Sequence, residues 1–282
     1  MTIPYSPCFH NQKYILLCWR KTLTGFRWLK ENMIVAVATQ KGGTGKTTTS
    51  ISLAAGLARL HNKKILLIDI DSQANTSKVL VPDYRSLPKE QTICATLLDR
   101  APLPVLQSAV PGLDVVASHI LLSNADVELT TAKDHREARL RDRLEPIRSQ
   151  YDHIFIDCPP ALGWLTINAF TAADSVLVVV EPGYFELDSI VQLNKTLAEV
   201  REFYHPSLHI LGYLFTKSDP TVNSRESLKL LRQAYTDKVC RTVIPRNVSL
   251  KDAIFNKKDI FEFEPTSKAA LAYQKLIEEL FI

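Results

Sequence analysis

A glycine-rich loop that carries lysine and threonine constrains this sequence more than any other feature. The loop Gly42-Gly43-Thr44-Gly45-Lys46-Thr47 follows the apolar run Ile34–Ala38 and opens the helical stretch Thr47–Leu60. Glycines allow the backbone to bend so that its N–H groups point at one anion, and the helix directs its positive N-terminus at the same place. Between a strand and a helix, this pattern predicts a binding site for nucleotide phosphates.

The polar side chains of the loop have separate expected roles. Lys46 is expected to reach the β and γ phosphates of a nucleotide, and the Thr47 hydroxyl is expected to bind Mg²⁺. Lys41 adds a second ammonium group to the same short loop. Two cations on one turn repel each other unless a polyphosphate neutralises both. We therefore expect Lys41 to contact phosphate as well.

Apolar strand-like runs alternate with helical stretches from Met33 to the end of the sequence. Continuous runs of valine, isoleucine and leucine are typical of parallel strands that helices cover on both faces. We predict one α/β domain of the P-loop NTPase type over residues 33–282, with a mostly parallel twisted sheet and helices on both faces. The predicted strands are Ile34–Ala38, Lys64–Asp69, Asp114–Ala117, His153–Asp157, Ser175–Val180, His209–Phe215 and Val239–Ile244. The predicted helices are Thr47–Leu60, Arg136–Ser149, Leu187–Phe203, Ser224–Ala234 and Ser267–Leu280.

An aspartate ends the strand-like run His153–Asp157. An aspartate after a strand is most often a helix or turn cap. Behind a phosphate loop in an α/β chain, however, four residues leading to an acid at a strand end form the Walker B arrangement. Asp157 is therefore expected to hold Mg²⁺ through water.

Composition excludes several classes of protein. The sequence is 46% hydrophobic, but it holds no run of about 20 apolar residues that could form a spanning helix. Its five cysteines (Cys8, Cys18, Cys94, Cys158 and Cys240) show no paired spacing for a metal. We interpret them as reduced thiols in a cytoplasmic protein.

Charge is unevenly distributed along the sequence. Residues 1–32 carry five basic side chains and one acidic one, which accounts for the whole net charge of +4. Within the neutral remainder, Lys217 to Lys258 holds ten basic residues and four acidic ones. This asymmetry indicates a polyanionic partner for the last third of the chain.

The first 32 residues do not continue the alternation of strands and helices, and we treat them as an N-terminal extension. Three interpretations remain open. They could be translated sequence upstream of a true start at Met33, a tail, or a helix that lies on a membrane through Ile15, Leu16, Trp19, Leu23 and Phe26. The short apolar run and the basic residues after it do not fit a secretory signal.

The stretch from Lys41 through Gly42, Gly43, Thr44, Gly45, Lys46 and Thr47 to Thr48 resembles the deviant Walker A motif of the ParA/MinD ATPases, which belong to the SIMIBI class. The resemblance covers nearly all of residues 33–282. It implies that these eight residues bind ATP and that Lys41 is the signature lysine. In that family this lysine reaches across a dimer interface to the partner's ATP and acts as an arginine finger does elsewhere.

Further segments carry the same resemblance. Leu66 to Asn75 looks like the first switch of the family, which implies that Asp71 orients the attacking water and that Asp69 supports the metal shell. Ser72 stands where relatives often have proline. Ile244-Pro245-Arg246-Asn247-Val248 resembles the segment that frames adenine, and Thr216-Lys217-Ser218-Asp219 is similar to the base-reading motif of G proteins. Lys217, Pro245 and Arg246 are therefore expected at the base.

Other branches of the family fit less well. A MinD-like tail needs a basic amphipathic helix, whereas Ala269 to Ile282 has only Lys275 against Glu278 and Glu279. The iron protein of nitrogenase needs cluster cysteines in glycine-rich surroundings, and amidoligases of the cobyrinic-acid type generally add a glutaminase domain. Large ParA proteins carry an N-terminal helix-turn-helix domain, which we do not expect in this sequence. Among the branches of the family, the sequence therefore resembles small, Soj-like ParA proteins most.

This resemblance implies a slow ATPase that dimerises with ATP and Mg²⁺, binds DNA without sequence preference, and positions cargo on the nucleoid with a ParB-like or other adaptor. The cargo is expected to be a plasmid, a chromosome or a protein organelle such as carboxysomes. Stable membrane association is not expected. Alternatives are a MinD-like membrane ATPase and an ATP-dependent ligase of the cobyrinic-acid class. The candidate DNA-binding residues are Arg225, Lys229, Arg232, Arg246, Lys251, Lys257 and Lys258, although Ser249 replaces an arginine common in relatives.

Overall fold

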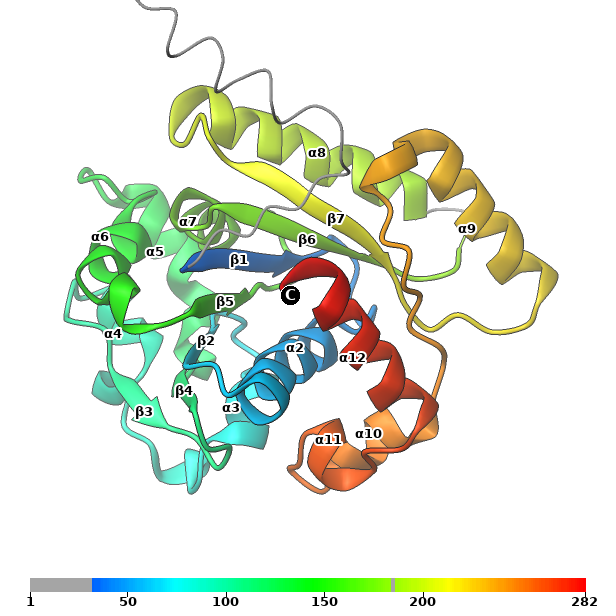
Figure 1. Cartoon of the computed structure of the whole chain (residues 1–282). Coiled ribbons are helices and arrows are strands. Elements are labelled where there is room, and N and C mark those ends of the chain that lie inside the picture. Colours follow the sequence, from blue (N-terminus) through cyan, green and yellow to red (C-terminus); the bar gives the residue numbers. More distant parts are fainter. Residues whose placement is uncertain (1–31, 184–185) are drawn as a thin grey trace, which may run out of the picture.

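The computed structural model describes residues 32–183 and 186–282, in which a seven-stranded sheet lies between two layers of helices (Figure 1). The strand order is β3-β4-β2-β5-β1-β6-β7, and every neighbouring pair is parallel except β3 and β4. The strands are β1 (Met33–Ala38), β2 (Ile65–Asp69), β3 (Val105–Gln107), β4 (Leu113–Val116), β5 (His153–Asp157), β6 (Ser175–Val180) and β7 (His209–Phe215).

Alternation along the central strands divides the core into two layers. Ile34 and Ala36 of β1 pack with the helices on one face, whereas Val35 and Val37 pack with those on the other. The sheet is therefore covered on both sides, as the continuous apolar runs predicted.

The α-helices are α2 (Lys46–His61), α3 (Asn75–Leu80), α4 (Ile93–Leu97), α5 (Ala125–Thr131), α6 (Arg139–Leu144), α7 (Trp164–Ala172), α8 (Glu186–Phe203), α9 (Val222–Tyr235), α10 (Val248–Phe255), α11 (Ile260–Phe263) and α12 (Lys268–Leu280).

The predicted fold class is confirmed, and six predicted strands lie within one residue of their observed ends. The predicted strand Val239–Ile244 is wrong. This segment touches β7 at an isolated bridge between Tyr213 and Val239 and again where the Ile244 N–H donates to the Phe215 carbonyl at 2.9 Å, but no continuous ladder forms between them. The N–H groups of Arg241 and Thr242 donate instead to the Glu279 carboxylate on α12, at 2.7 and 2.9 Å. A side chain far along the sequence thus replaces the strand partner.

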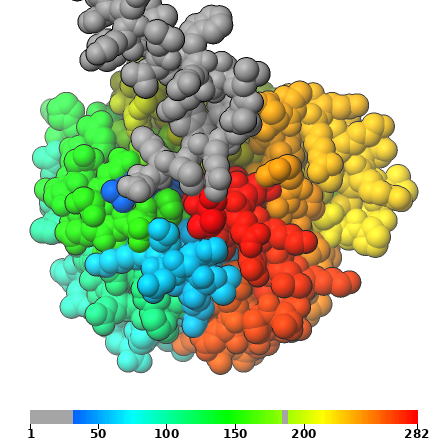
Figure 2. Space-filling view, in the orientation of Figure 1, coloured from blue at the N-terminus to red at the C-terminus, as the bar shows by residue number. Residues whose placement is uncertain are grey.

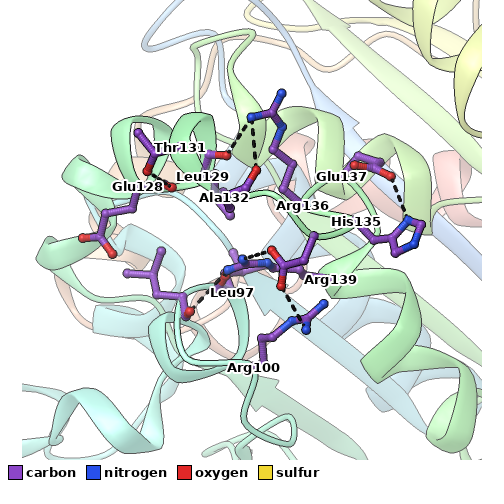
Figure 3. A network of polar contacts seen from close by, with 12 residues as sticks. Leu97, Arg100, Glu128, Leu129, Thr131, Ala132, His135, Arg136, Glu137 and Arg139 are labelled. Carbon is purple, nitrogen blue, oxygen red and sulfur yellow. Dashed lines mark hydrogen bonds and ion pairs between the residues drawn. The ribbon is translucent and has the colours of Figure 1, made fainter.

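The helix predicted for Arg136–Ser149 is also wrong at both ends, because α6 spans only Arg139–Leu144. Figure 3 shows that the Arg136 guanidinium turns back to the end of α5, where it donates to the carbonyls of Leu129 and Ala132 at 3.2 and 3.4 Å. Unpaired carbonyls at a helix end accept such a cation well. After α6 the chain tightens into a 3₁₀ helix that begins with Glu145 and Pro146, since proline cannot donate an intrahelical hydrogen bond.

The same arginine supports the segment that follows Asp157. Arg136 lies over the ring of Trp164, 4.0 Å from its centroid, and Trp164 Nε1 donates to Thr130 Oγ1 at 3.0 Å. Trp164 is the first residue of α7. A cation over an indole ring is a favourable contact, so this stack fixes the start of α7 against α5.

The C-terminal helix is joined closely to the helix that follows the phosphate loop. A Cβ built on Gly56 of α2 would lie 2.4 Å from Ile277 Cδ1 and 2.7 Å from a ring carbon of Phe261, so only glycine permits this approach. Nearer the loop, Thr49 Oγ1 and Tyr273 Oη share a buried hydrogen bond of 3.0 Å. α12 thus forms part of the support behind the start of α2.

His153 at the start of β5 gives the fold a measurable dependence on pH. The side chain is buried against Phe281, with 5.3 Å between ring centroids, and burial lowers the pKa of His153 from 6.5 to about 4. Between these pH values the unfolded chain binds the proton more readily than the folded chain. The free energy of unfolding is therefore expected to decrease by about 3 kcal/mol as the pH falls through this window.

Urea unfolding of wild type and His153→Phe at pH 7.5 and pH 4.5 checks this prediction. The variant keeps a ring against Phe281 and lacks the titrating group, so its loss on acidification should be smaller than that of wild type by about 2 kcal/mol. His135→Gln, at a side chain that is 84% exposed, is the matched control and should behave as wild type. Equal losses in wild type and His153→Phe would contradict the assignment.

The expectations about the N-terminal extension, membrane-spanning helices and the cysteines can be compared with the structure only in part. The N-terminal extension, including the apolar stripe from Ile15 to Phe26, lies outside the described residues apart from Asn32. Within the described ranges, no helix is both long enough and apolar enough to cross a membrane. Cys94, Cys158 and Cys240 are buried free thiols, and the other two cysteines lie outside these ranges.

Candidate nucleotide-binding site

The carboxyl ends of three neighbouring strands bring the predicted phosphate and metal residues together. β2, β5 and β1 lie side by side, and Asp69 and Asp157 are direct partners in the β2–β5 register. β1 leads into the loop from Lys41 to Thr48, and β2 leads to Asp71. Loops at the carboxyl edge of a parallel sheet are the usual place for a ligand in this fold class.

The loop backbone leaves room for an anion. Gly43 and Gly45 adopt φ angles of 78° and 99°, which side chains other than glycine rarely tolerate. A Cβ built on Gly42 or Gly43 would meet no atom of the described chain within 4 Å. Gly45 is the N-cap of α2 and supplies no side-chain cap, so the first N–H groups of this helix need another acceptor.

Two buried polar groups in the loop fit a phosphate. The Thr44 hydroxyl is fully buried and has no hydrogen-bond partner among the described residues. Lys46 is 6% exposed, and its burial lowers its pKa although the charges of Asp157 and Asp71 oppose this effect. Buried polar groups are normally satisfied, and a buried ammonium needs anionic partners. Phosphate oxygens meet both needs.

Asp69 and Asp157 are buried carboxylates on adjacent strands. Burial raises the pKa of each, and for Asp69 the neighbouring charge of Asp157 adds to the effect. Two neighbouring buried carboxyl groups can both be ionised at low free-energy cost only when a cation lies close to them. The pair therefore suits a divalent cation.

Hydroxyl groups orient Asp157 toward the start of α2. Ser50 Oγ donates to one carboxylate oxygen at 3.2 Å and Thr76 Oγ1 donates to the other at 2.8 Å, while the Thr47 hydroxyl also hydrogen-bonds this carboxylate. The described residues contain no group of three or more His, Cys, Asp or Glu placed to hold a metal. A cation bound by Thr47 and Asp157 would take its remaining ligands from phosphate and water.

Asp69 has a structural role in the first switch. Its carboxylate accepts the Ser77 N–H and Oγ at 2.9 and 2.7 Å, and its other oxygen accepts the Asp71 N–H at 3.1 Å. These bonds fix the turn from β2 into α3. The Asp71 carboxylate accepts the Gln73 N–H at 2.9 Å and faces the charge of Lys46. The catalytic role of Asp71 and the metal role of Asp69 stay predictions.

The segment after β7 lies against the phosphate loop. Lys217 has a left-handed backbone, with φ of 51°, and its ammonium group donates to the Gly43 carbonyl. Thr216 Oγ1 donates to the Thr44 carbonyl at 2.8 Å. The β7 end therefore braces the loop from outside, a contact that sequence reasoning about a base-reading motif did not anticipate.

The segment expected at the base runs beside this brace. Ser218 forms a parallel bridge with Pro245, and the Arg246 N–H donates to the Ser218 carbonyl at 2.8 Å. The Arg246 side chain is 67% exposed and lies 3.7 Å from the Asp219 carboxylate. Pro245 and Arg246 thus pair with Ser218, the residue that follows Lys217. Their contact with a base stays a prediction.

Sequence reasoning missed one acidic residue at the site. Glu181 directly follows β6, the neighbour of β1, and its carboxylate lies 2.8 Å from the Lys41 ammonium and 3.0 Å from that of Lys217. The signal was present, because a single acid after the apolar run Ser175–Val180 follows the same pattern as Asp157. Only the strand order places it beside the loop.

The predicted DNA-binding side chains are all exposed, and all except Arg246 fall into two groups. The α9 group is Arg225, Lys229 and Arg232, and the α10 group is Lys251 on α10 with Lys257 and Lys258 just after it. Figure 1 shows α9 and α10 apart, with the connection that carries Arg246 between them. In Figure 2 the chain from β7 onward, yellow to red, covers one side of the face shown. These cations therefore lie on separate elements, and their contact with DNA stays a prediction.

Comparison with known proteins gives close relatives. A family model described as an AAA domain matches residues 32–210. The chain is 40% identical over 250 residues to sporulation initiation inhibitor protein Soj of Bacillus subtilis, which covers 88% of this chain and 97% of that protein. It is 41% identical to chromosome-partitioning ATPase Soj of Thermus thermophilus, over 87% of this chain and 94% of that one. Chromosome partitioning protein ParA of Myxococcus xanthus is 37% identical, with 90% and 89% covered.

A solved structure shows the same fold under another name. A Mycobacterium smegmatis protein named cobyrinic acid a,c-diamide synthase, with a bound ATP analogue and magnesium, superposes with a TM-score of 0.75. The two chains are 30% identical, and the match covers 87% of this chain and 93% of that one.

Proposed function

This chain belongs to the ParA/Soj family of partition ATPases, and on that premise we propose that it binds Mg·ATP in the loop from Lys41 to Thr48, dimerises, and binds DNA without sequence preference. Hydrolysis of ATP then dissociates the dimer and releases the DNA. Support comes from the relatives at 37% to 41% identity over most of the chain. It also comes from a loop whose buried Thr44 hydroxyl and Lys46 ammonium call for anionic oxygens.

Each polar group of the site has a distinct task in this proposal. The backbone N–H groups of the loop and the start of α2 bind phosphate oxygens, and Lys46 neutralises the β and γ phosphates. The Thr47 hydroxyl and the carboxylate of Asp157 would hold Mg²⁺, which offsets the charge of the phosphates. Asp71 orients the attacking water, and Asp69 fixes the turn that carries Asp71.

The exposed position of the Lys41 side chain is the observation that supports the dimer proposal. Its side chain is 49% exposed at the outer edge of the loop, whereas Lys46 is buried inside it. The inner lysine serves the subunit's own phosphates, and the outer one faces the surface where a second subunit would bring another nucleotide. Mutual approach of two such loops places each Lys41 at the partner's triphosphate, where it stabilises the charge that develops during phosphoryl transfer.

DNA binding is expected to depend on the α9 group. Arg225, Lys229 and Arg232 occupy one helical face and are exposed, and dimerisation doubles their number. Replacing Arg225 and Arg232 with glutamate should weaken ATP-dependent binding to non-specific DNA by at least about 10-fold and flatten its salt dependence, because contacts to phosphate are lost. Fluorescence anisotropy with a labelled random duplex at several salt concentrations measures both effects.

A matched charge change elsewhere controls this experiment. Arg141→Glu/Arg143→Glu makes the same change on the exposed surface of α6, on the other side of the molecule in Figure 1, and should bind DNA nearly as wild type does. The same loss in both double variants would mean that net charge alone matters. Absence of DNA binding by the wild type with ATP would contradict both the proposed DNA binding and the proposed role on the nucleoid.

The proposed cellular role is the movement of a cargo over nucleoid DNA in the cytoplasm, with an adaptor protein that stimulates hydrolysis. A chromosome is the cargo named for the relatives above. A plasmid or a protein organelle such as a carboxysome needs only a different adaptor. Stimulation of ATP hydrolysis by the protein encoded beside this one would identify the adaptor and hence the cargo.

A second candidate, an ATP-dependent ligase, follows from the name of the Mycobacterium smegmatis protein. That chain is nearly covered by this one, so a separate glutaminase domain is not what distinguishes the two. The ligase predicts ATP turnover that requires a small carboxylic acid, such as a corrin acid, and an amide donor. Turnover stimulated by DNA and an adaptor without any acid would exclude it.

A further inference from the structure

Glu181 joins two lysines at the edge of the phosphate loop. One carboxylate oxygen lies 2.8 Å from Lys41 Nζ and the other lies 3.0 Å from Lys217 Nζ. The Glu181 side chain is 17% exposed, less than either lysine. Burial alone would raise its pKa, but the hydrogen bonds from Lys41 and Lys217 outweigh burial and lower the pKa. Glu181 is therefore a charged partner of both lysines.

Lys217 is the less exposed of the two lysines and has a further contact with the loop. Lys217 donates to Glu181 and also to the Gly43 carbonyl, so it stays at the loop without Lys41. Lys41 is the more exposed of the two, and exposed ion pairs are weak. A triphosphate carries several negative charges and, at a closed interface, lies in a poorly screened environment. It can therefore take Lys41 from Glu181, which keeps Lys217 as a counter-ion.

We propose that Glu181 is a positioning residue that holds Lys41 on its own subunit until a partner's triphosphate displaces it, and so sets the protein concentration at which the ATP dimer forms. This inference rests on the proposed function, because it needs a dimer in which Lys41 changes partner. It assigns the Lys41–Glu181 pair to the nucleotide-free subunit and a Lys41–phosphate contact to the dimer. The carboxylate thus competes with dimerisation.

Glu181→Gln tests the competition because it keeps the shape of the side chain and removes the charge. Sedimentation velocity with a non-hydrolysable ATP analogue and Mg²⁺ gives the protein concentration at half dimerisation. The variant should reach it at a concentration about fivefold lower than wild type, as expected when a weak surface ion pair no longer competes. Glu264→Gln, at an exposed glutamate after α11, is the control and should match wild type.

Amine labelling in the nucleotide-free protein gives a readout that a merely structural role would not move. The Glu181 carboxylate occupies the Lys41 ammonium group, which must be free to react with an acylating reagent, so acetic anhydride should label Lys41 faster in Glu181→Gln than in wild type. The exposed Lys251 serves as the internal reference in the same mass spectrum. Equal Lys41 labelling in both proteins would overturn the inference.

The outcomes separate this inference from the proposed function. A wild-type protein that stays monomeric with the analogue contradicts the dimer and ends both. A wild type that dimerises, beside a Glu181→Gln variant with an unchanged or higher half-point, overturns the role of Glu181 alone. If Glu181→Gln lowers the melting temperature strongly, Glu181→Asp replaces it. Its shorter side chain withdraws the charge from Lys41, and it too should lower the half-point.

Discussion

Replacement of Lys46 by glutamine is expected to reduce the affinity for ATP by about 100-fold or more, the largest loss of ATP affinity expected from any single substitution in the site. Lys46 is a buried cation, and truncating one partner of a buried charge pair costs about 3 to 5 kcal/mol. The lost charge also leaves Asp157 and Asp71 without the ammonium group that acts on them. Isothermal titration with ATP and Mg²⁺ measures the change directly.

Two variants control for the Lys46 substitution. Lys46→Arg keeps the charge and should retain more affinity than Lys46→Gln. Lys63→Gln removes a lysine at the other end of α2, where it is 39% exposed beside Asp152, and should bind ATP as wild type does. Near-normal ATP affinity in Lys46→Gln with an unchanged melting temperature would remove the phosphate role from this loop.

Substitution of Lys41 by alanine should have the opposite signature, with nearly normal ATP binding by the monomer and almost no hydrolysis. In related chemistry a cation supplied across an interface raises the rate by about 1,000-fold or more, so the rate of ATP hydrolysis should fall by about that factor. Turnover assays and ATP titration on the same preparation separate this variant from Lys46→Gln.

A mixture of the two inactive variants distinguishes action across the interface from action within one subunit. In a mixed dimer, one site combines the intact Lys46 of the Lys41→Ala subunit with the intact Lys41 of the Lys46→Gln subunit. Hydrolysis should therefore reappear on mixing, although each variant alone is inactive. A mixture as inactive as its components would show that Lys41 serves its own subunit.

The meeting of the phosphate loop with Asp69 and Asp157 at one edge of the sheet was predictable because its signals are local. The loop from Lys41 to Thr48 encodes both a turn and its chemistry in eight consecutive residues. Asp157 could be found for a related reason, since the apolar run before it marks a buried parallel strand and the carboxyl end of such a strand lies at the ligand edge. Local pattern therefore sufficed for the fold class and for the strands that meet at the site.

Features that depend on distant partners were not predictable in this way. Glu181 reaches Lys41 only because β6 lies beside β1, and a sequence read without that order gives no reason to pair them. The segment Val239–Ile244 has the composition of a strand, yet Glu279 of α12 accepts the N–H groups of Arg241 and Thr242 in its middle. In both cases a contact between remote residues decides the local structure.

Weak or short signals explain the remaining differences. β3 is three residues long, antiparallel and mostly exposed at the edge of the sheet, so it lacks the apolar run by which the other strands were recognised. The helix expected from Arg136 begins at Arg139 because Arg136 binds the carbonyls at the end of α5. A charged residue in a helical pattern cannot reveal that it serves the preceding helix.

The central claim is that the outer lysine of the loop acts on the nucleotide of a second subunit. A structure determined with a non-hydrolysable ATP analogue and Mg²⁺ tests it most directly. We expect two subunits face to face, with each Lys41 Nζ within hydrogen-bond distance of phosphate oxygens held by the other subunit's loop. A nucleotide-bound single subunit whose Lys41 remains on its own Glu181 would contradict the account.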